Sequence, residues 1–122
     1  MSVEMKTDGM SDRKLLSSIC FAASGRNGSS GVASAMLTGE PGAERLADVK
    51  VLFRQEPAYR GGLHFGARFA EAPDGRIFVS VGERFEMRFA QDLDRHWGKG
   101  VRIDTQGRAP ADNPFMGTAG AR

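Results

Sequence analysis

The sequence lacks long apolar runs: no stretch approaches the ~20 residues that a membrane-spanning helix needs, so no membrane span is expected. It contains a single cysteine, Cys20, which excludes an internal disulfide. With that cysteine and only two histidines, the chain also lacks the ligands of a structural zinc site. These absences leave the class of ordinary single domains, because 122 residues are enough to bury one hydrophobic core.

A strong charge of one sign is also lacking, since 17 Lys and Arg residues face 15 Asp and Glu residues, for a formal net charge of +2. The two signs are interleaved along the chain, as in residues 83–88 and 92–95. A nucleic-acid-binding surface would need Lys and Arg gathered on one face or stripe. We therefore expect no nucleic-acid partner.

Aromatic residues are few, at 8%, whereas glycine is abundant, with 16 residues. Such a chain turns often and builds few long helices, which favours a β-rich fold. Pro73, Asp74 and Gly75 separate two strand-like segments and indicate a hairpin. Residues 89–97 alone resemble a helical turn or two. The strands are expected at residues 18–24, 32–37, 48–54, 67–72, 77–81 and 100–104.

The N-terminal residues show neither helical nor strand periodicity, and we interpret residues 1–17 as a disordered leader. The alternative is a signal peptide, because the basic pair at 13–14 precedes a short apolar stretch and small residues. Two serines interrupt that stretch and acidic residues precede the basic pair, so a first strand at 18–24 is the preferred interpretation.

His64 is the residue best placed to carry chemistry. Gly61, Gly62 and Gly66 surround it, and such glycines let a ligand approach the backbone and leave the imidazole accessible. A neutral imidazole can take a proton from a hydroxyl near neutral pH, so His64 is a candidate general base. The alternative is a structural histidine that caps a strand or donates to a loop carbonyl.

Glu83 follows the segment 77–81 through Gly82. If that segment pairs with 67–72, Glu83 and His64 lie at the same edge of the sheet. A carboxylate there can bind one ring nitrogen, fix the tautomer and stabilise the imidazolium. The alternative is a surface carboxylate paired with a nearby arginine, Arg84 or Arg88.

The second histidine, His96, follows an Asp-x-Asp pair that also occurs in calcium-binding loops. Trp97 and Ile103 stand where such a loop needs a glycine and a closing glutamate, so no metal site is predicted. We expect His96 and Trp97 to pack or to form a turn.

Several segments, taken in their order along the chain, are more specific than these single residues. They are VLFRQEP (51–57), HFGAR (64–68), APDGRIFVSVGER (72–84), AQDL (90–93), VRID (101–104) and PADNPF (110–115). Together they resemble the soluble quinoprotein glucose/sorbosone dehydrogenases, which are aldose sugar dehydrogenases that use pyrroloquinoline quinone. The resemblance covers residues 46–115 and extends back toward residue 18.

The resemblance implies an all-β chain that forms about one to two blades of a six-bladed β-propeller. It divides the chain into the leader at 1–17, a partial propeller domain at 18–115 and a truncated tail at 116–122. His64 would be the general base for the anomeric hydroxyl of an aldose and would also contact the quinone. Glu83 would orient His64, at a position where the family commonly has Asp. The expected product is a lactone.

The resemblance also implies the cofactors pyrroloquinoline quinone and Ca²⁺, most of whose ligands would follow residue 122, so we expect an internal piece of the enzyme. Members of the family are generally exported to the periplasm. A piece of a propeller leaves sheet edges and faces uncovered, which favours self-association. The alternative function is therefore a non-catalytic propeller piece that acts only in binding or in self-association.

Overall fold

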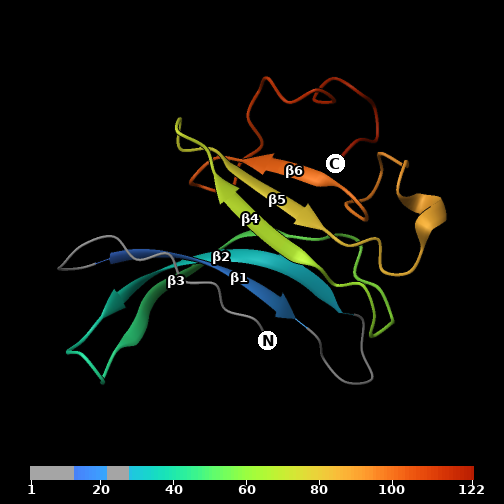
Figure 1. Ribbon diagram of the computed structural model, residues 1–122. Coiled ribbons are helices and arrows are strands. Elements are labelled where there is room, and N and C mark those ends of the chain that lie inside the picture. The colour runs from blue at the N-terminus through green and yellow to red at the C-terminus, as the bar shows by residue number, and fades with distance from the viewer. Residues whose placement is uncertain (1–12, 22–27) are drawn as a thin grey trace.

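Two three-stranded antiparallel sheets, of strand order β1-β2-β3 and β4-β5-β6, lie one above the other (Figure 1). The computed structural model describes residues 13–21 and 28–122, with side chains from residue 28 onward. Helical structure in these residues is limited to one 3-10 turn, so the expected all-β class is confirmed. In chain order the elements are β1 (Arg13–Phe21), β2 (Ser29–Thr38), β3 (Arg45–Arg54), β4 (Ala67–Glu71), β5 (Ile77–Val81), η1 (Met87–Phe89) and β6 (Gly100–Ile103).

The hydrophobic core lies between the two sheets. Along β5 the side chains alternate, so that Ile77, Val79 and Val81 are buried while Phe78 is about half exposed (49%). This alternation follows from the two-residue period of a strand and directs one face of the upper sheet toward the lower one. The cluster is completed by Val32, Leu52, Phe53 and Ile103.

The hairpin between β4 and β5 forms where the sequence indicated it. The amide of Gly75 donates to the carbonyl of Ala72 (2.9 Å), and Gly75 has φ +79°, which only glycine adopts without strain. The Asp74 carboxylate accepts the backbone amide of Arg76 (3.0 Å). The pairing Ala67↔Val81 then fixes the register of the two strands, which determines where the flanking loops emerge.

The outer face of β3 is apolar and exposed. Leu46 pairs with Leu37 and Val51 pairs with Ala33, two residues that share one face of β2, so Leu46 and Val51 share a face as well. Val49, two residues before Val51, joins them. The three side chains Leu46, Val49 and Val51 are 49%, 57% and 44% exposed. Strand β3 is also an outer strand of its sheet among the described residues.

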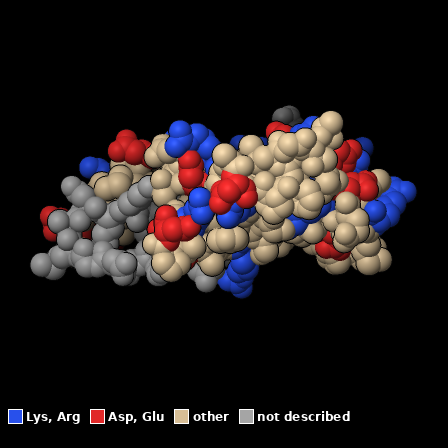
Figure 2. Space-filling model, turned by 90° about the horizontal axis from the view of Figure 1, so that it is seen from above, with Lys and Arg blue, Asp and Glu red and all other residues tan. Residues whose placement is uncertain are grey.

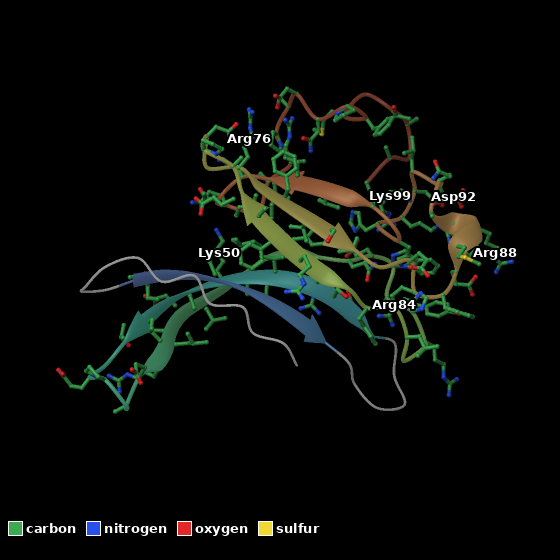
Figure 3. The ribbon with its side chains drawn as sticks, in the orientation of Figure 1. Lys50, Arg76, Arg84, Arg88, Asp92 and Lys99 are labelled. Carbon is green, nitrogen blue, oxygen red and sulfur yellow. The ribbon has the colours of Figure 1, made fainter. Side chains whose placement is uncertain are left out.

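The helical turn expected at 89–97 is wrong in place and extent. Only Met87–Phe89 is helical, and the following residues form turns that pack on other segments. The Lys99 ammonium donates to the carbonyls of Phe89 (3.3 Å), Ala90 (2.5 Å) and Trp97 (2.8 Å), which satisfies these groups without a helix (Figure 3).

The first strand also differs from the expectation. It was expected at 18–24, but β1 spans Arg13–Phe21 and pairs with β2 from Arg13↔Leu37 to Phe21↔Ser29. It begins earlier because β2 reaches Thr38 and continues to offer backbone partners. Residues 22–24 and the expected leader as far as residue 12 lie outside the described residues.

Candidate active site

The site lies where two loops leave the same edge of the upper sheet. One loop precedes β4 and carries His64; the other follows β5 and carries Glu83. Because β4 and β5 are antiparallel, with Ala67 opposite Val81, the start of one strand and the end of the other are adjacent. The structure therefore brings together the two residues that the sequence analysis selected.

The imidazole Nδ1 of His64 is hydrogen-bonded to the Oε1 atom of Glu83. An ionised carboxylate only accepts, so Nδ1 must carry the proton in this contact. In the neutral form of the ring, the other nitrogen, Nε2, then keeps its lone pair and can accept a proton from a ligand. The His64 side chain is 47% exposed and that of Glu83 is 24% exposed, so the pair is accessible from outside.

The pKa of the Glu83 carboxyl is lowered from its ordinary value. The main cause is the hydrogen bond from His64, and backbone N–H groups at Glu83 and Phe85 add to it. Each of these donors favours the charged carboxylate over the neutral acid. Glu83 is therefore ionised at neutral pH, as a residue that fixes a histidine tautomer must be.

Gly82 allows the two loops to meet. A Cβ atom at this position would lie 2.0 Å from the carbonyl oxygen of His64, far inside contact distance. The Gly82 amide also donates to the carbonyls of Phe65 (3.3 Å) and Gly66 (3.2 Å). Only glycine permits this approach, which holds Glu83 next to His64.

Two buried polar side chains support these loops, one from Ser30 in β2 and one from Gln55, which directly follows β3. The Gln55 side-chain amide, 1% exposed, donates to the carbonyl of Gly82 at 2.7 Å. The Ser30 hydroxyl, 0% exposed, donates to the carbonyl of Phe65 at 2.7 Å. Gln55 and Ser30 are in turn joined by a backbone hydrogen bond of 2.7 Å. Each donor therefore fixes a residue next to His64 or Glu83.

Arg84 is a third buried support. Its side chain is 1% exposed and lies with the guanidinium 3.3 Å from the centre of the Phe65 ring. It donates to the carbonyl of Gly61 at 2.8 Å (Figure 3). Arg88, the other arginine considered as a partner of Glu83, pairs with Glu86 at 3.1 Å. Arg84 thus ties the loop after β5 to the loop that carries His64.

Sequence reasoning missed these supports. Ser30 lies in a stretch rich in Gly and Ser that resembles a turn, and Gln55 follows a strand without any distinguishing pattern. Their partners are 35 and 27 residues away in the chain, so only the packing of the two sheets reveals them.

The second histidine is structural, as expected. His96 Nδ1 accepts the backbone amide of Glu56 (2.9 Å), and the ring packs on Phe53 with 5.1 Å between centroids. Burial lowers the pKa of His96, so its ring is neutral at neutral pH. Trp97 is buried beside it, and its indole N–H donates to the carbonyl of Pro57 (2.9 Å).

The described residues contain no group of three or more His, Cys, Asp or Glu that could hold a metal ion. Within the same residues, no helix is long and apolar enough to cross a membrane. On the face seen in Figure 2, positive and negative side chains are mixed around a broad uncharged area, so this face carries no basic stripe.

Comparison with known proteins identifies the class of protein to which this chain belongs. The chain matches the family model described as glucose / sorbosone dehydrogenase over residues 3–122. It superimposes on a solved glucose dehydrogenase with a TM-score of 0.75 and 34% identity, covering 90% of this chain and 31% of that one. The two packed sheets are therefore part of a β-propeller of the sugar dehydrogenase class.

The chain belongs to the glucose/sorbosone dehydrogenase family. It is 42% identical to the aldose sugar dehydrogenase YliI of Escherichia coli over 78 residues, which are 64% of this chain and 21% of the relative. The solved apo-form of the soluble aldose sugar dehydrogenase from Escherichia coli gives a TM-score of 0.74 at 34% identity, covering 90% of this chain and 31% of that chain. The chain thus spans about a fifth of the length of the curated relative.

Proposed function

We propose that this chain supplies the proton-transfer part of a quinoprotein sugar dehydrogenase, which oxidises an aldose at its anomeric carbon to a lactone. The observation that carries the proposal is the hydrogen bond between His64 Nδ1 and Glu83, which leaves Nε2 free to accept a proton. Membership of the glucose/sorbosone dehydrogenase family supports a sugar as the substrate.

In this proposal the lone pair of His64 Nε2 takes the proton of the anomeric hydroxyl. Glu83 remains ionised, holds Nδ1–H in place and stabilises the imidazolium that forms. The hydroxyl oxygen, freed of its proton, becomes the lactone carbonyl as the anomeric carbon loses a hydride. The exposed His64 side chain lets the sugar reach Nε2 without a rearrangement of the loop.

The proposed oxidant, pyrroloquinoline quinone, would supply the acceptor for the hydride when bound. Among the described residues His64 is the one that we assign to its contact, and no group of acidic or histidine side chains suited to Ca²⁺ is found among them. The described residues therefore account for the general base but not for the binding of the quinone or of Ca²⁺. No step of the reaction is assigned to either cofactor. We place the remaining ligands in the parts of the relatives that this chain does not span.

The test replaces the corresponding segment of the Escherichia coli relative by this chain and compares the chimera with its His64→Ala variant. We expect the variant to lose turnover by about 100-fold or more while it still binds the quinone. Glu83→Gln, which keeps the hydrogen bond but not the charge, should lose less turnover than His64→Ala and should shift the pH profile of turnover.

Full turnover in the His64→Ala chimera would remove His64 from the mechanism. A measurement on the chain alone gives an independent answer. The nitrogen chemical shifts of the His64 ring should identify the tautomer protonated at Nδ1, and a ring protonated at Nε2 instead would contradict the proposed base.

Two further parts of the proposal concern the cellular location of the chain and its self-association. We propose export to the periplasm, on the basis of the family resemblance. We also propose self-association of two copies through β3, supported by its exposed Leu46, Val49 and Val51 and by its position at the edge of a sheet. Secretion of a tagged chain and sedimentation velocity test these two statements.

A further inference from the structure

The loop after β5 contains an unusual backbone conformation. Arg84 and Phe85 have φ values of +63° and +64°, a left-handed conformation that glycine adopts readily and other residues seldom do. Two such residues in succession are costly, and costly backbone conformations gather at functional sites. Each of the two residues therefore needs a reason to be there in place of glycine.

Arg84 has a reason within the fold. Its side chain is buried, lies against the Phe65 ring and donates to the carbonyl of Gly61. These contacts join the two loops of the site and offset the cost of its conformation. A glycine at position 84 would lose all of them.

Phe85 has no comparable reason. Its side chain is 65% exposed, so burial of the ring contributes little to offset the cost of its conformation. Large aromatic side chains usually contribute to stability by removing their surface from water, and this one leaves most of it in water. The residue thus combines a costly backbone with an exposed apolar ring, which is the opposite of what stability alone favours.

The position of the Phe85 ring supplies the missing reason. Its centre lies 5.1 Å from the centre of the His64 imidazole, and the two rings are nearly perpendicular, at 81°. The exposed ring therefore stands directly beside the imidazole that we propose as the base. A molecule that donates a hydroxyl to this imidazole approaches a site that the Phe85 ring borders.

We infer that Phe85 is a substrate-binding residue, which holds the apolar C–H face of a cyclic aldose while His64 meets its anomeric hydroxyl. The inference rests on the proposed function. A pyranose carries hydroxyls around its rim and C–H bonds on its faces, so it needs an apolar platform next to a polar acceptor. Phe85 and His64 offer this combination, and such pairing of apolar walls with few polar groups is typical of small-molecule sites.

The test titrates the complete chain with D-glucose and follows the ring resonances of His64 and Phe85 by NMR. We expect both to shift with one dissociation constant. Phe85→Gly should raise the dissociation constant for glucose at least 5-fold. It should leave the melting temperature unchanged or raise it, because glycine adopts the left-handed conformation without strain. The acyclic hexitol sorbitol, which has the hydroxyls but no ring face, should shift neither residue.

The matched control is Asp48→Gly, which relieves a similar conformation (φ +52°) in β3, away from the site. It should leave the glucose constant unchanged. Equal affinity in the wild type and Phe85→Gly would overturn the inference and leave the proposed base intact. A lower melting temperature of Phe85→Gly, with a displaced His64 signal before any sugar is added, would assign Phe85 a structural role and also overturn it.

Absence of any glucose-induced shift in the wild-type chain would overturn the inference as well. The proposed function is judged separately, by the turnover of the chimera and its His64→Ala variant. The two failures are therefore distinguishable.

Discussion

The side-chain amide of Gln55 donates to the carbonyl oxygen of Gly82, the residue that precedes Glu83, across a distance of 2.7 Å. Gln55 directly follows β3 of the lower sheet and Gly82 directly follows β5 of the upper one, so this hydrogen bond joins the ends of two strands from different sheets next to Glu83. The position of the carboxylate therefore depends on a residue that is itself out of reach of any substrate.

Gln55→Met tests this dependence. Methionine has a similar size but cannot donate, so the Gly82 carbonyl loses its partner and we expect a loss of about 1–3 kcal/mol in the free energy of unfolding. The His64 ring signals should shift in the same variant. Gln106→Met, at an exposed position, is the control and should change stability by less than about 0.5 kcal/mol in urea unfolding. Equal effects of the two variants would contradict the support assigned to Gln55.

Gly82→Ala tests the close approach of the two loops. The added methyl would lie 2.0 Å from the His64 carbonyl oxygen, so the loops must separate and we expect a loss of about 1–3 kcal/mol or more. Gly62→Ala in the neighbouring loop meets nothing within 4 Å and should be nearly neutral. Calorimetry of both variants checks the difference, and a stable Gly82→Ala chain would mean that the loops do not need this contact.

His96 predicts a pH dependence of stability. Burial lowers its pKa below the ordinary value of 6.5, so between these two values the unfolded chain binds a proton that the folded chain does not. The contribution of neutral His96 is therefore fully present above pH 6.5 and is lost as the pH falls toward the folded pKa. The charged groups that act on the ring are Glu56, which raises the pKa, and Arg122 and Lys99, which lower it.

Urea unfolding of the wild type and of His96→Asn at several pH values measures this contribution. The wild type should lose more stability than the variant between pH 7.5 and pH 5, and the two should run parallel above pH 7.5. Parallel curves over the whole range would show that His96 is equally protonated in both states.

Self-association through β3 predicts the effect of a charged residue on its outer face. Val49→Lys and Val51→Lys should reduce concentration-dependent association, because like charges would meet where apolar side chains now lie. Ser80→Lys, at an exposed position of β5, is the control and should leave association unchanged. Sedimentation velocity over a range of concentrations measures the effect, and a wild-type chain that remains a monomer throughout would contradict the proposal.

The sequence predicted the parts of the fold that local chemistry determines. Alternating apolar residues mark β5, and Asp74 and Gly75 mark the hairpin, so the register of β4 and β5 followed, and with it the nearness of His64 and Glu83. The family resemblance selected the same two residues. Their roles in catalysis stay predictions.

Other parts of the structure could not be predicted, because they depend on contacts between distant segments. The carbonyls of Phe89, Ala90 and Trp97 accept hydrogen bonds from the ammonium of Lys99 instead of from helical amides. No local sequence pattern predicts these contacts. Likewise, no periodicity of the sequence indicates the left-handed conformations of Arg84 and Phe85. Periodicity describes a single strand or helix and does not report which polar groups meet between layers.

The indole of Trp97 is buried and hydrogen-bonded to the Pro57 carbonyl, so its intrinsic fluorescence reports on the folded state of the chain. The sequence contains one tryptophan, so the emission arises from a single place, where the turns after η1 pack on the loop that follows β3. Separation of these segments would expose the indole to water and move its emission to longer wavelength. The packing of these segments can thus be followed in every variant without a label.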